Sequence, residues 1–413
     1  MSDRYRRALV ERLQATDAIR GTDVRAAFLE VPRESFLPGV AEEHGVEAVY
    51  RDEAYPTKTD VQGNAISSSS QPGIMASMLE ALNVSPGLKV LEIGTGTGYN
   101  AALLSRLVGP KGRVTSVELD RDVARTARRV LGTGGYRVNV VVGDGRHGWT
   151  RGAPYDRIIV TASSLDVPAA FLHQLQEGGL IVMPLRLSDT VPFRQVVVAF
   201  QRRGRRLRSV SVIHGGFMRL RERPEDPSVP WPVWEVAEAR DATRRVVASL
   251  TGPTLDTLSP DERRQMLGLI VSTPRSERIG IRASGRSQWG LETFLVLAVP
   301  EDRLVGCTRS DLEHLLFYST ALPGVIDVSG APSLAHLGGG KTISRILAYG
   351  GRAAERLLSA FVDEWCERGR PDVSRLRVEV LYDRRPSRPA WRTKRQGSST
   401  LLFDWDRGSA HRR

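Results

Sequence analysis

Residues 90–99 have the sequence VLEIGTGTGY. A hydrophobic strand pattern comes first, and it contains one acidic residue, Glu92. Three glycines follow, Gly94, Gly96 and Gly98, and one threonine separates each from the next. Glycine has no Cβ atom, so the chain can turn sharply here and approach a bound ligand closely. A strand, a glycine turn and a helix in this order are typical of a nucleotide-binding turn.

The pattern after the turn alternates between strands and helices. Helical patterns, such as those at 100–107 and 121–131, separate apolar runs that are rich in β-branched residues. These runs lie at 89–93, 113–117, 138–142, 156–160 and 179–183. Strands that alternate with helices predict a parallel sheet with helices on both faces. Two later runs, 195–200 and 207–213, are expected to form a closing hairpin at the sheet edge.

Acidic residues at three strand ends indicate which nucleotide binds. A dinucleotide fingerprint has the spacing G-x-G-x-x-G, whereas this chain has G-x-G-x-G with Glu92 in the strand before it. That carboxylate would repel a pyrophosphate but suits S-adenosyl-L-methionine, which carries a sulfonium and an ammonium group. Glu118 ends the next strand, where it can hold ribose hydroxyls, and Asp144 ends the third, where adenine would lie. The sequence therefore predicts an α/β, Rossmann-like class I methyltransferase core.

Several motifs, in order, resemble those of the protein-L-isoaspartate O-methyltransferases. They are VPRESFLP, AVYRDEAYP, SQPGIMASMLEAL, VLEIGTGTGYNAALLSRLVG, VVVGDGRHGW and LHQLQEGGLIVMPL, which together span residues 31–185. The resemblance implies a transferase that uses S-adenosyl-L-methionine to esterify a carboxylate on a peptide. The predicted cofactor-binding residues are Glu92, Gly94, Thr95, Gly96, Gly98, Tyr99, Glu118, Leu119, Asp144 and Gly145.

The serine run in AISSSSQPG departs from the family pattern, in which the sequence IS directly precedes the start of a helix. Counting back from Pro72 gives Ser70 the position of the active-site serine, whereas counting forward from Ile66 gives it to Ser67. Ser70 is preferred, because Pro72 favours a first helical turn and fixes the register there. The candidate catalytic residues are Ser70, Ser67 and Ser69, and a polar turn without a chemical role is the alternative.

The expected chemistry needs no general base. A carboxylate nucleophile, with a pKa near ~4, is already ionised at neutral pH. The protein has only to position the reactants and exclude water, and a serine hydroxyl can hydrogen-bond one carboxylate oxygen without neutralising the other.

A proline-rich segment, RPEDPSVPWP, suggests a domain boundary. Residues 1–223 are expected to form the methyltransferase domain, with a helical segment at 1–60 contributing to the substrate site, and 224–234 a linker. Residues 235–413 are expected to form a C-terminal α+β domain, without catalytic motifs, that recruits the peptide and ends in a basic tail. Its helices are predicted at 235–250, 259–271, 310–321 and 341–368, and its strands at 293–299, 375–382 and 399–405.

Composition limits the class of protein. The 413 residues are 41% hydrophobic and contain two distant cysteines, Cys307 and Cys366, which fits the cytoplasm and predicts no metal site. No segment resembles a signal peptide or a membrane span, so no membrane partner is expected. The net charge is +12. Basic clusters at 202–208 and 384–413 could bind an acidic peptide or simply be solvated; without a nucleic-acid-binding motif, nucleic acid is not expected as a partner.

The layout as a whole resembles the long actinobacterial members of the family that accompany the biosynthesis of ribosomal peptides of the lanthipeptide and graspetide type. This resemblance implies a precursor peptide as partner, either acidic or macrocyclic, and an aspartate side chain as the methylated group. The ester could then close to a succinimide (aspartimide) and open to isoaspartate. General isoaspartyl repair is the alternative enzyme function, and a non-catalytic peptide-binding scaffold is an alternative of another class. The oligomeric state stays open.

Overall fold

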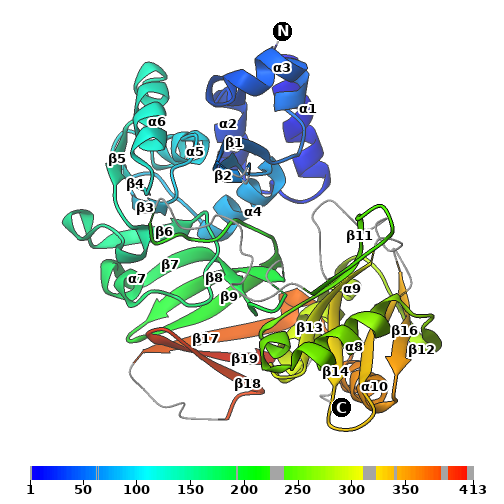
Figure 1. Cartoon of the computed structure of the whole chain (residues 1–413). Coiled ribbons are helices and arrows are strands. Elements are labelled where there is room, and N and C mark those ends of the chain that lie inside the picture. The colour runs from blue at the N-terminus through cyan, green and yellow to red at the C-terminus, as the bar shows by residue number, and fades with distance from the viewer. Residues whose placement is uncertain are drawn as a thin grey trace.

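The computed structural model describes residues 2–406, apart from 62, 64, 192–193, 224–236, 310–321, 339–341 and 383–388. The predicted proline-rich linker, the helix expected at 310–321 and the last seven residues of the basic tail lie outside the described residues. Three sheets, of two, seven and ten strands, organise the rest (Figure 1). Among the described helices, none is long and apolar enough to span a membrane.

The parallel half of the ten-stranded sheet has the predicted Rossmann-like form. Its strands are β3 (Lys89–Ile93), β4 (Arg113–Glu118), β5 (Val138–Val142), β6 (Tyr155–Val160) and β7 (Leu175–Arg186), in the spatial order β5-β4-β3-β6-β7. The accompanying helices are α4 (Pro72–Leu82), α5 (Tyr99–Val108), α6 (Arg121–Thr133) and α7 (Ala169–Gln174), with 3-10 turns at η2 (Gly145–His147) and η3 (Thr150–Gly152). The strand order reverses between β3 and β6, and ligands bind at such a switch point, outside the carboxyl ends of the strands.

The predicted hairpin forms, but it does not end the sheet. Strands β8 (Gln195–Arg203) and β9 (Arg206–His214) pair antiparallel, as expected. Strand β9 then pairs with β17 (Leu376–Tyr382), which pairs with β19 (Ser399–Trp405), and β18 (Arg392–Gln396) forms the outer edge. The prediction of an edge hairpin was wrong because the strand that covers it comes from 160 residues further along the chain.

Part of the predicted basic surface is neutralised by this pairing. Arg206 and Arg208 of β9 both form ion pairs with Glu379 of β17, at 3.3 and 3.2 Å. Lys394 of β18, within the predicted tail, forms an ion pair with Glu301 at 2.8 Å. Residues 392–405 of the predicted basic tail are therefore folded into the sheet as β18, β19 and the turn between them.

The N-terminal residues form a helical layer on the transferase sheet. It consists of α1 (Ser2–Ala15), α2 (Thr22–Glu30), η1 (Arg33–Phe36) and α3 (Pro38–Val49), followed by the two-stranded sheet of β1 (Tyr55–Thr59) and β2 (Ala65–Ser69). Helix α2 contacts α5, and both α1 and α2 contact α4. The apolar faces of these helices share one core with Leu103 and Leu104 of α5.

Most of the other described residues form an α+β unit around an antiparallel seven-stranded sheet. The strands are β10 (Ala237–Arg240), β11 (Val246–Thr251), β12 (Arg275–Ala283), β13 (Leu304–Arg309), β14 (Leu322–Asp327), β15 (Ser333–Gly338) and β16 (Ile343–Gly350). The helices are α8 (Pro260–Val271), α9 (Arg286–Ala298) and α10 (Ala353–Glu367), and η4 (Pro253–Thr257) and η6 (Val373–Arg375) are 3-10 turns. Helix α8 lies within the helix predicted at 259–271, and it starts at a capping box in which Ser259 and Glu262 bond each other's backbone.

Three predictions for this unit were wrong. Strands β10 and β11 occupy most of the region where a helix was expected at 235–250, and strand β16 lies near the start of the expected helix 341–368. The expected strand 293–299 lies in helix α9, whose residues from Gly290 to Ala298 are all buried. A helix that is buried on every side shows no helical period, so its apolar run is indistinguishable from that of a buried strand.

The two halves of the chain share one hydrophobic core. A single cluster contains Ile181 of β7 and Leu207 of β9 together with Phe294 of α9, Trp365 of α10 and Val380 of β17. In Figure 1 the last strands, orange to red, lie beside the green strands of the transferase sheet. The sheets therefore divide differently from the predicted domains, since residues 376–405 belong to the transferase sheet.

We expect a chain that ends at Arg223 not to fold. It would leave the backbone of β9 unpaired and expose core residues such as Leu207, which is fully buried. Solubility and thermal unfolding followed by circular dichroism measure this, with a chain that ends at Asp406 as the control. The control is expected to unfold as the full chain does. A chain 1–223 that is soluble and unfolds cooperatively at a similar temperature would contradict the shared core.

Candidate functional site

A cavity of about 730 Å³ opens at the switch point of the transferase sheet. Its walls come from the glycine turn after β3, from the end of β4, from the serines of β2 and from residues 214–221 after β9. Ala54 and Pro56, from the segment predicted to contribute to the substrate site, also line it. The structure thus brings the predicted cofactor turn and the predicted substrate serines to one cavity.

The turn after β3 requires glycine at three positions. Gly94, Gly96 and Gly98 have φ angles of 94°, 51° and 89°, in the left-handed region that other residues rarely adopt. A Cβ atom at Gly94 would lie 2.3 Å from Thr161 Oγ1. The turn passes close to the serine strand, because a Cβ at Gly96 would lie 3.4 Å from the backbone oxygen of Ser68.

Glu118 is an acidic side chain at the cavity wall. Its Oε2 accepts a hydrogen bond from the backbone N–H of Gly96 at 2.9 Å, and its Oε1 accepts from those of Leu119 and Asp120 at 2.8 and 3.1 Å. Burial raises the pKa of this carboxyl, although the backbone donors oppose the rise. A carboxylate oxygen accepts about two hydrogen bonds, so Oε2 keeps capacity for a donor on a ligand.

Glu92 lies behind the cavity wall rather than in it. The side chain is fully buried, and it accepts hydrogen bonds from Asn100 Nδ2 at 2.8 Å and Ser116 Oγ at 2.5 Å. Burial raises its pKa to about 7. Asn100 does line the cavity, and its Oδ1 is buried with no hydrogen-bond partner in the described part of the chain. This oxygen is therefore an acceptor that a ligand N–H group can satisfy.

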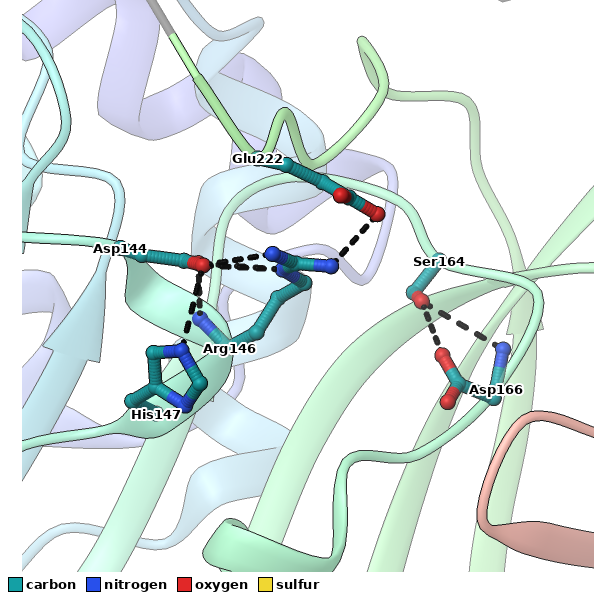
Figure 2. Close-up of polar contacts among 6 residues, drawn as sticks. All are labelled: Asp144, Arg146, His147, Ser164, Asp166 and Glu222. Atoms are coloured by element: carbon teal, nitrogen blue, oxygen red, sulfur yellow. Dashed lines mark hydrogen bonds and ion pairs between the residues drawn. The ribbon is translucent and has the colours of Figure 1, made fainter.

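Asp144 is held by the residue two places after it (Figure 2). Arg146 donates to its carboxylate from the backbone nitrogen at 2.9 Å and from Nη2 at 2.7 Å, and Nη1 also reaches Glu222 at 2.5 Å. Burial alone would raise the pKa of Asp144, but these bonds lower it below its ordinary value. Figure 2 also shows a separate pair, in which Ser164 Oγ donates to Asp166 at 2.8 Å.

Most of the predicted cofactor residues line the cavity, and three do not. Glu92, Gly98 and Asp144 are not part of the lining: Glu92 supports Asn100, Gly98 caps α5, and Asp144 binds Arg146. The seven that line it are Gly94, Thr95, Gly96, Tyr99, Glu118, Leu119 and Gly145.

All three candidate serines line the cavity, but their surroundings differ. Ser67 Oγ accepts a hydrogen bond from Thr57 Oγ1 at 3.1 Å, and Ser69 is buried. The Ser70 hydroxyl has no hydrogen-bond partner among the described residues. Pro72 is the first residue of α4, which is the register that favours Ser70.

A buried arginine holds the end of the serine strand. Arg33 is fully buried and donates to the backbone oxygens of Val49 at 2.7 Å, Glu53 at 3.0 Å and Ser70 at 3.1 Å. It therefore ties the N-terminal layer to the predicted substrate serine. Arg33 belongs to the motif VPRESFLP, but an arginine that binds backbone oxygens leaves no signal of its role in the sequence.

Three further residues of the cavity wall were not predicted. His214 is the last residue of β9, Arg219 follows that strand, and Trp289 comes from α9 in the second half of the chain. Arg219 forms no ion pair with another described residue. None of the three lies in a recognisable motif, and Trp289 is some 190 residues away from the glycine turn.

The fold and the cavity define a class I methyltransferase. The sequence profile of the protein-L-isoaspartate(D-aspartate) O-methyltransferase family matches residues 4–220. The chain belongs to this family.

Curated relatives from two archaea extend the comparison. A protein-L-isoaspartate O-methyltransferase of Methanopyrus kandleri is 44% identical over 184 residues, which are 44% of this chain and 77% of the relative. One from Pyrobaculum neutrophilum is 38% identical over 52% of this chain and 98% of its own length. Nearly all of that relative thus corresponds to about half of this chain. A solved structure of a protein-L-isoaspartate O-methyltransferase, 25% identical, covers 92% of this chain and 97% of its own with a TM-score of 0.49.

The cavity suits the cofactor of this family, S-adenosyl-L-methionine, and the prediction of that cofactor is confirmed. The unsatisfied Asn100 Oδ1 and the spare capacity of Glu118 Oε2 are acceptors, which match a ligand that carries an ammonium group and ribose hydroxyls. The bare glycine turn lets such a ligand approach the backbone.

Loss of the strand-end acids is expected to weaken cofactor binding. Glu118→Ala removes acceptors for the ligand, and Asp144→Ala frees Arg146 beside Gly145 in the wall. Each should raise the Kd for S-adenosyl-L-methionine about tenfold or more, since a hydrogen bond to a charged group contributes about 1.5–3 kcal/mol. Isothermal calorimetry measures this. The control is Asp166→Ala, which removes an acid that neither lines the cavity nor forms a hydrogen bond with Arg146. Unchanged affinity in both variants would contradict the assignment.

Glu92 is expected to make the ligand-free protein less stable at high pH. Its pKa rises from an ordinary 4.5 to about 7 in the folded state, so the folded state binds the proton more tightly than the unfolded state. Stability therefore falls as the pH rises between these two values, by about 3 kcal/mol at ~1.4 kcal/mol per pH unit.

Glu92→Gln keeps an acceptor for Asn100 and removes the titration. Urea unfolding at pH 5 and pH 8 should therefore show a smaller loss of stability in this variant than in the wild type. Parallel losses in the two proteins would show that Glu92 titrates normally.

Proposed function

We propose that the protein is an S-adenosyl-L-methionine-dependent carboxyl O-methyltransferase that esterifies an aspartyl or isoaspartyl carboxylate of a peptide. The observation that carries this proposal is the shared cavity. The glycine turn of the cofactor side and the serine strand of the substrate side face each other there, with Gly96 beside the backbone of Ser68. A methyl donor bound at the glycine turn and a carboxylate bound at the serine strand would lie next to each other in the same cavity.

The bound cofactor supplies an electrophilic methyl group on a sulfonium. The residues of this chain position the cofactor and the substrate carboxylate. Glu118, Asn100 and the glycine turn would hold the cofactor, and the Ser70 hydroxyl would donate to one oxygen of the substrate carboxylate. Arg219 lines the same cavity, and its positive charge would favour the binding of an anionic nucleophile. Apolar residues such as Ile74 and Met78 line the wall and limit the access of water.

The reaction does not require a proton acceptor. His214 is also a poor general base, because its imidazole ring does not take up a proton at neutral pH. Burial, together with the charge of Arg194, lowers the pKa of His214 to about 3, so the ring stays neutral. The carboxylate is already ionised at neutral pH. Rate acceleration would therefore come from orientation and from the exclusion of water.

The substrate that we propose is the aspartate side chain of a ribosomal precursor peptide. The second half of the chain supports this choice, because it lies beyond the family match at 4–220 and yet contributes Trp289 to the cavity wall. In the product the next backbone nitrogen can attack the ester carbonyl, so that methanol leaves and a succinimide forms. Water then opens the ring to aspartate or isoaspartate. The free thiols of Cys307 and Cys366 support action in the cytoplasm.

General repair of isoaspartyl residues is the second candidate, and the family match itself favours it. Methyl transfer from radiolabelled S-adenosyl-L-methionine distinguishes the two candidates. The assay compares short peptides that contain one L-isoaspartyl residue with peptides that contain one ordinary aspartate. The precursor proposal predicts methylation of aspartate in a suitable peptide context, whereas methylation of isoaspartyl peptides alone would favour repair. Cofactor binding without methyl transfer to any peptide would favour the non-catalytic scaffold.

Ser70→Ala is expected to lower kcat at least tenfold, with little change in cofactor affinity, because its free hydroxyl is placed to orient the carboxylate. Ser67→Ala should matter less, since Ser67 Oγ already accepts a hydrogen bond from Thr57. Steady-state methylation and calorimetry with the cofactor measure the two effects. The opposite ranking of the two variants would place the carboxylate at Ser67.

A further inference from the structure

The second half of the chain supplies an aromatic wall to the cavity. Trp289, on the first turn of α9, lines the cavity together with His214 at the end of β9. The centroids of the two rings are 3.4 Å apart, and their planes are inclined by 41°. A side chain beyond the family-matched region therefore packs directly on a residue of the transferase sheet.

A buried ion pair fixes the position of Trp289. Glu292, one turn further along α9, binds Arg194 at 2.6 Å, and their side chains are only 1% and 5% exposed. Arg194 precedes β8 of the transferase sheet, and its guanidinium carbon lies 5.4 Å from the centroid of the Trp289 ring. Removal of one partner of a buried pair is strongly unfavourable, so this contact holds α9 against the sheet. Trp289 is thus a fixed part of the wall.

His214, which lines the cavity, has a ring nitrogen with unused hydrogen-bonding capacity. Its Nε2 is buried, and it has no hydrogen-bond partner within the described part of the chain. A buried polar atom without a partner is unfavourable, so a ligand group that forms a hydrogen bond with it binds more tightly. A neutral imidazole nitrogen pairs with a peptide N–H or C=O without repelling it.

On the basis of the proposed function, we infer that Trp289 and His214 form a subsite for the residue next to the methylated carboxylate. His214 Nε2 bonds the peptide backbone, and the ring of Trp289 contacts the side chain of that neighbouring residue. The subsite takes an aliphatic or aromatic neighbour in preference to glycine, because an apolar side chain loses its contact with water against the indole. The second half of the chain then sets substrate choice within the cavity itself.

Methylation of a peptide panel tests this inference on the full chain. The peptides share one sequence with a single methylatable residue, either aspartate or L-isoaspartate, and the adjacent residue is leucine, phenylalanine or glycine. Wild type should prefer leucine and phenylalanine over glycine by about tenfold or more in kcat/KM, mainly through KM. Trp289→Ala should abolish this preference, whereas Trp289→Phe should keep most of it. The Kd for the cofactor should stay unchanged in both variants.

Three further variants distinguish a role in substrate binding from a merely structural effect. Arg286→Ala, an exposed change on the same helix, should behave as wild type. His214→Ala should lower kcat/KM for all peptides, and His214→Asn, which keeps a neutral hydrogen-bonding group, should restore part of the loss. A Trp289→Ala protein that unfolds as wild type does and keeps the full preference would overturn the subsite. An equal loss of kcat/KM on every peptide in the Trp289→Ala variant would overturn it as well.

The inference of a subsite and the proposed function can be refuted by different results. A wild-type protein that methylates no peptide of the panel refutes the proposed function. Calorimetry with the same peptides and S-adenosyl-L-homocysteine then tests the subsite alone. Tighter binding of the leucine and phenylalanine peptides, lost in Trp289→Ala, would support it. Equal binding of all peptides would overturn it.

Discussion

The pairing of β17 with β9 is the constraint on which the rest of the molecule depends. Strands from the end of the chain, beginning with β17 at Leu376, extend the same sheet that contains β3, the strand before the glycine turn. The pairing covers the open edge of β9, places Glu379 between Arg206 and Arg208, and buries Leu207 opposite Val380. An edge that the sequence of the first half leaves open is thus closed by the second half.

This closure also determines what surrounds the cavity. The chain between β9 and β17 must leave the sheet and return to it, and α9 packs into the same core on the way. The buried pair of Arg194 and Glu292 then fixes the helix so that Trp289 reaches the cavity. The second half therefore does two things at once: it completes the fold of the transferase sheet and it contributes a wall of the site. A separate recruiting domain, as the prolines suggested, is a poorer description than a single unit with a shared core.

The elements nearest the chemistry were predictable because local physical requirements fix them. The glycines have φ angles that other residues avoid, Pro72 starts a helix where its missing N–H costs nothing, and Glu118 ends its strand beside the turn. The roles of Glu92 and Asp144 were harder to predict, because their closest contacts are with Asn100, Ser116 and Arg146. Sequence spacing places an acid at a strand end but does not say which donor its carboxylate will meet.

The second half was predicted less well for a physical reason. Helix α9 is buried on every side from Gly290 to Ala298, so its apolar residues show no helical period in the sequence. Trp289 and the pairing of β17 with β9 depend on contacts between residues that are far apart in the chain. Long-range contacts of this kind leave no local signal, which is why the aromatic wall emerged only from the structure.

Hydrogen–deuterium exchange tests most directly whether the two halves form one substrate site. Exchange is compared for the full chain with S-adenosyl-L-homocysteine alone and with an isoaspartyl or aspartyl peptide added. The account predicts that the peptide slows exchange both in the serine segment, residues 65–71, and in the first turns of α9, residues 286–292. Slower exchange that is confined to residues 1–223, with α9 unchanged, would contradict it.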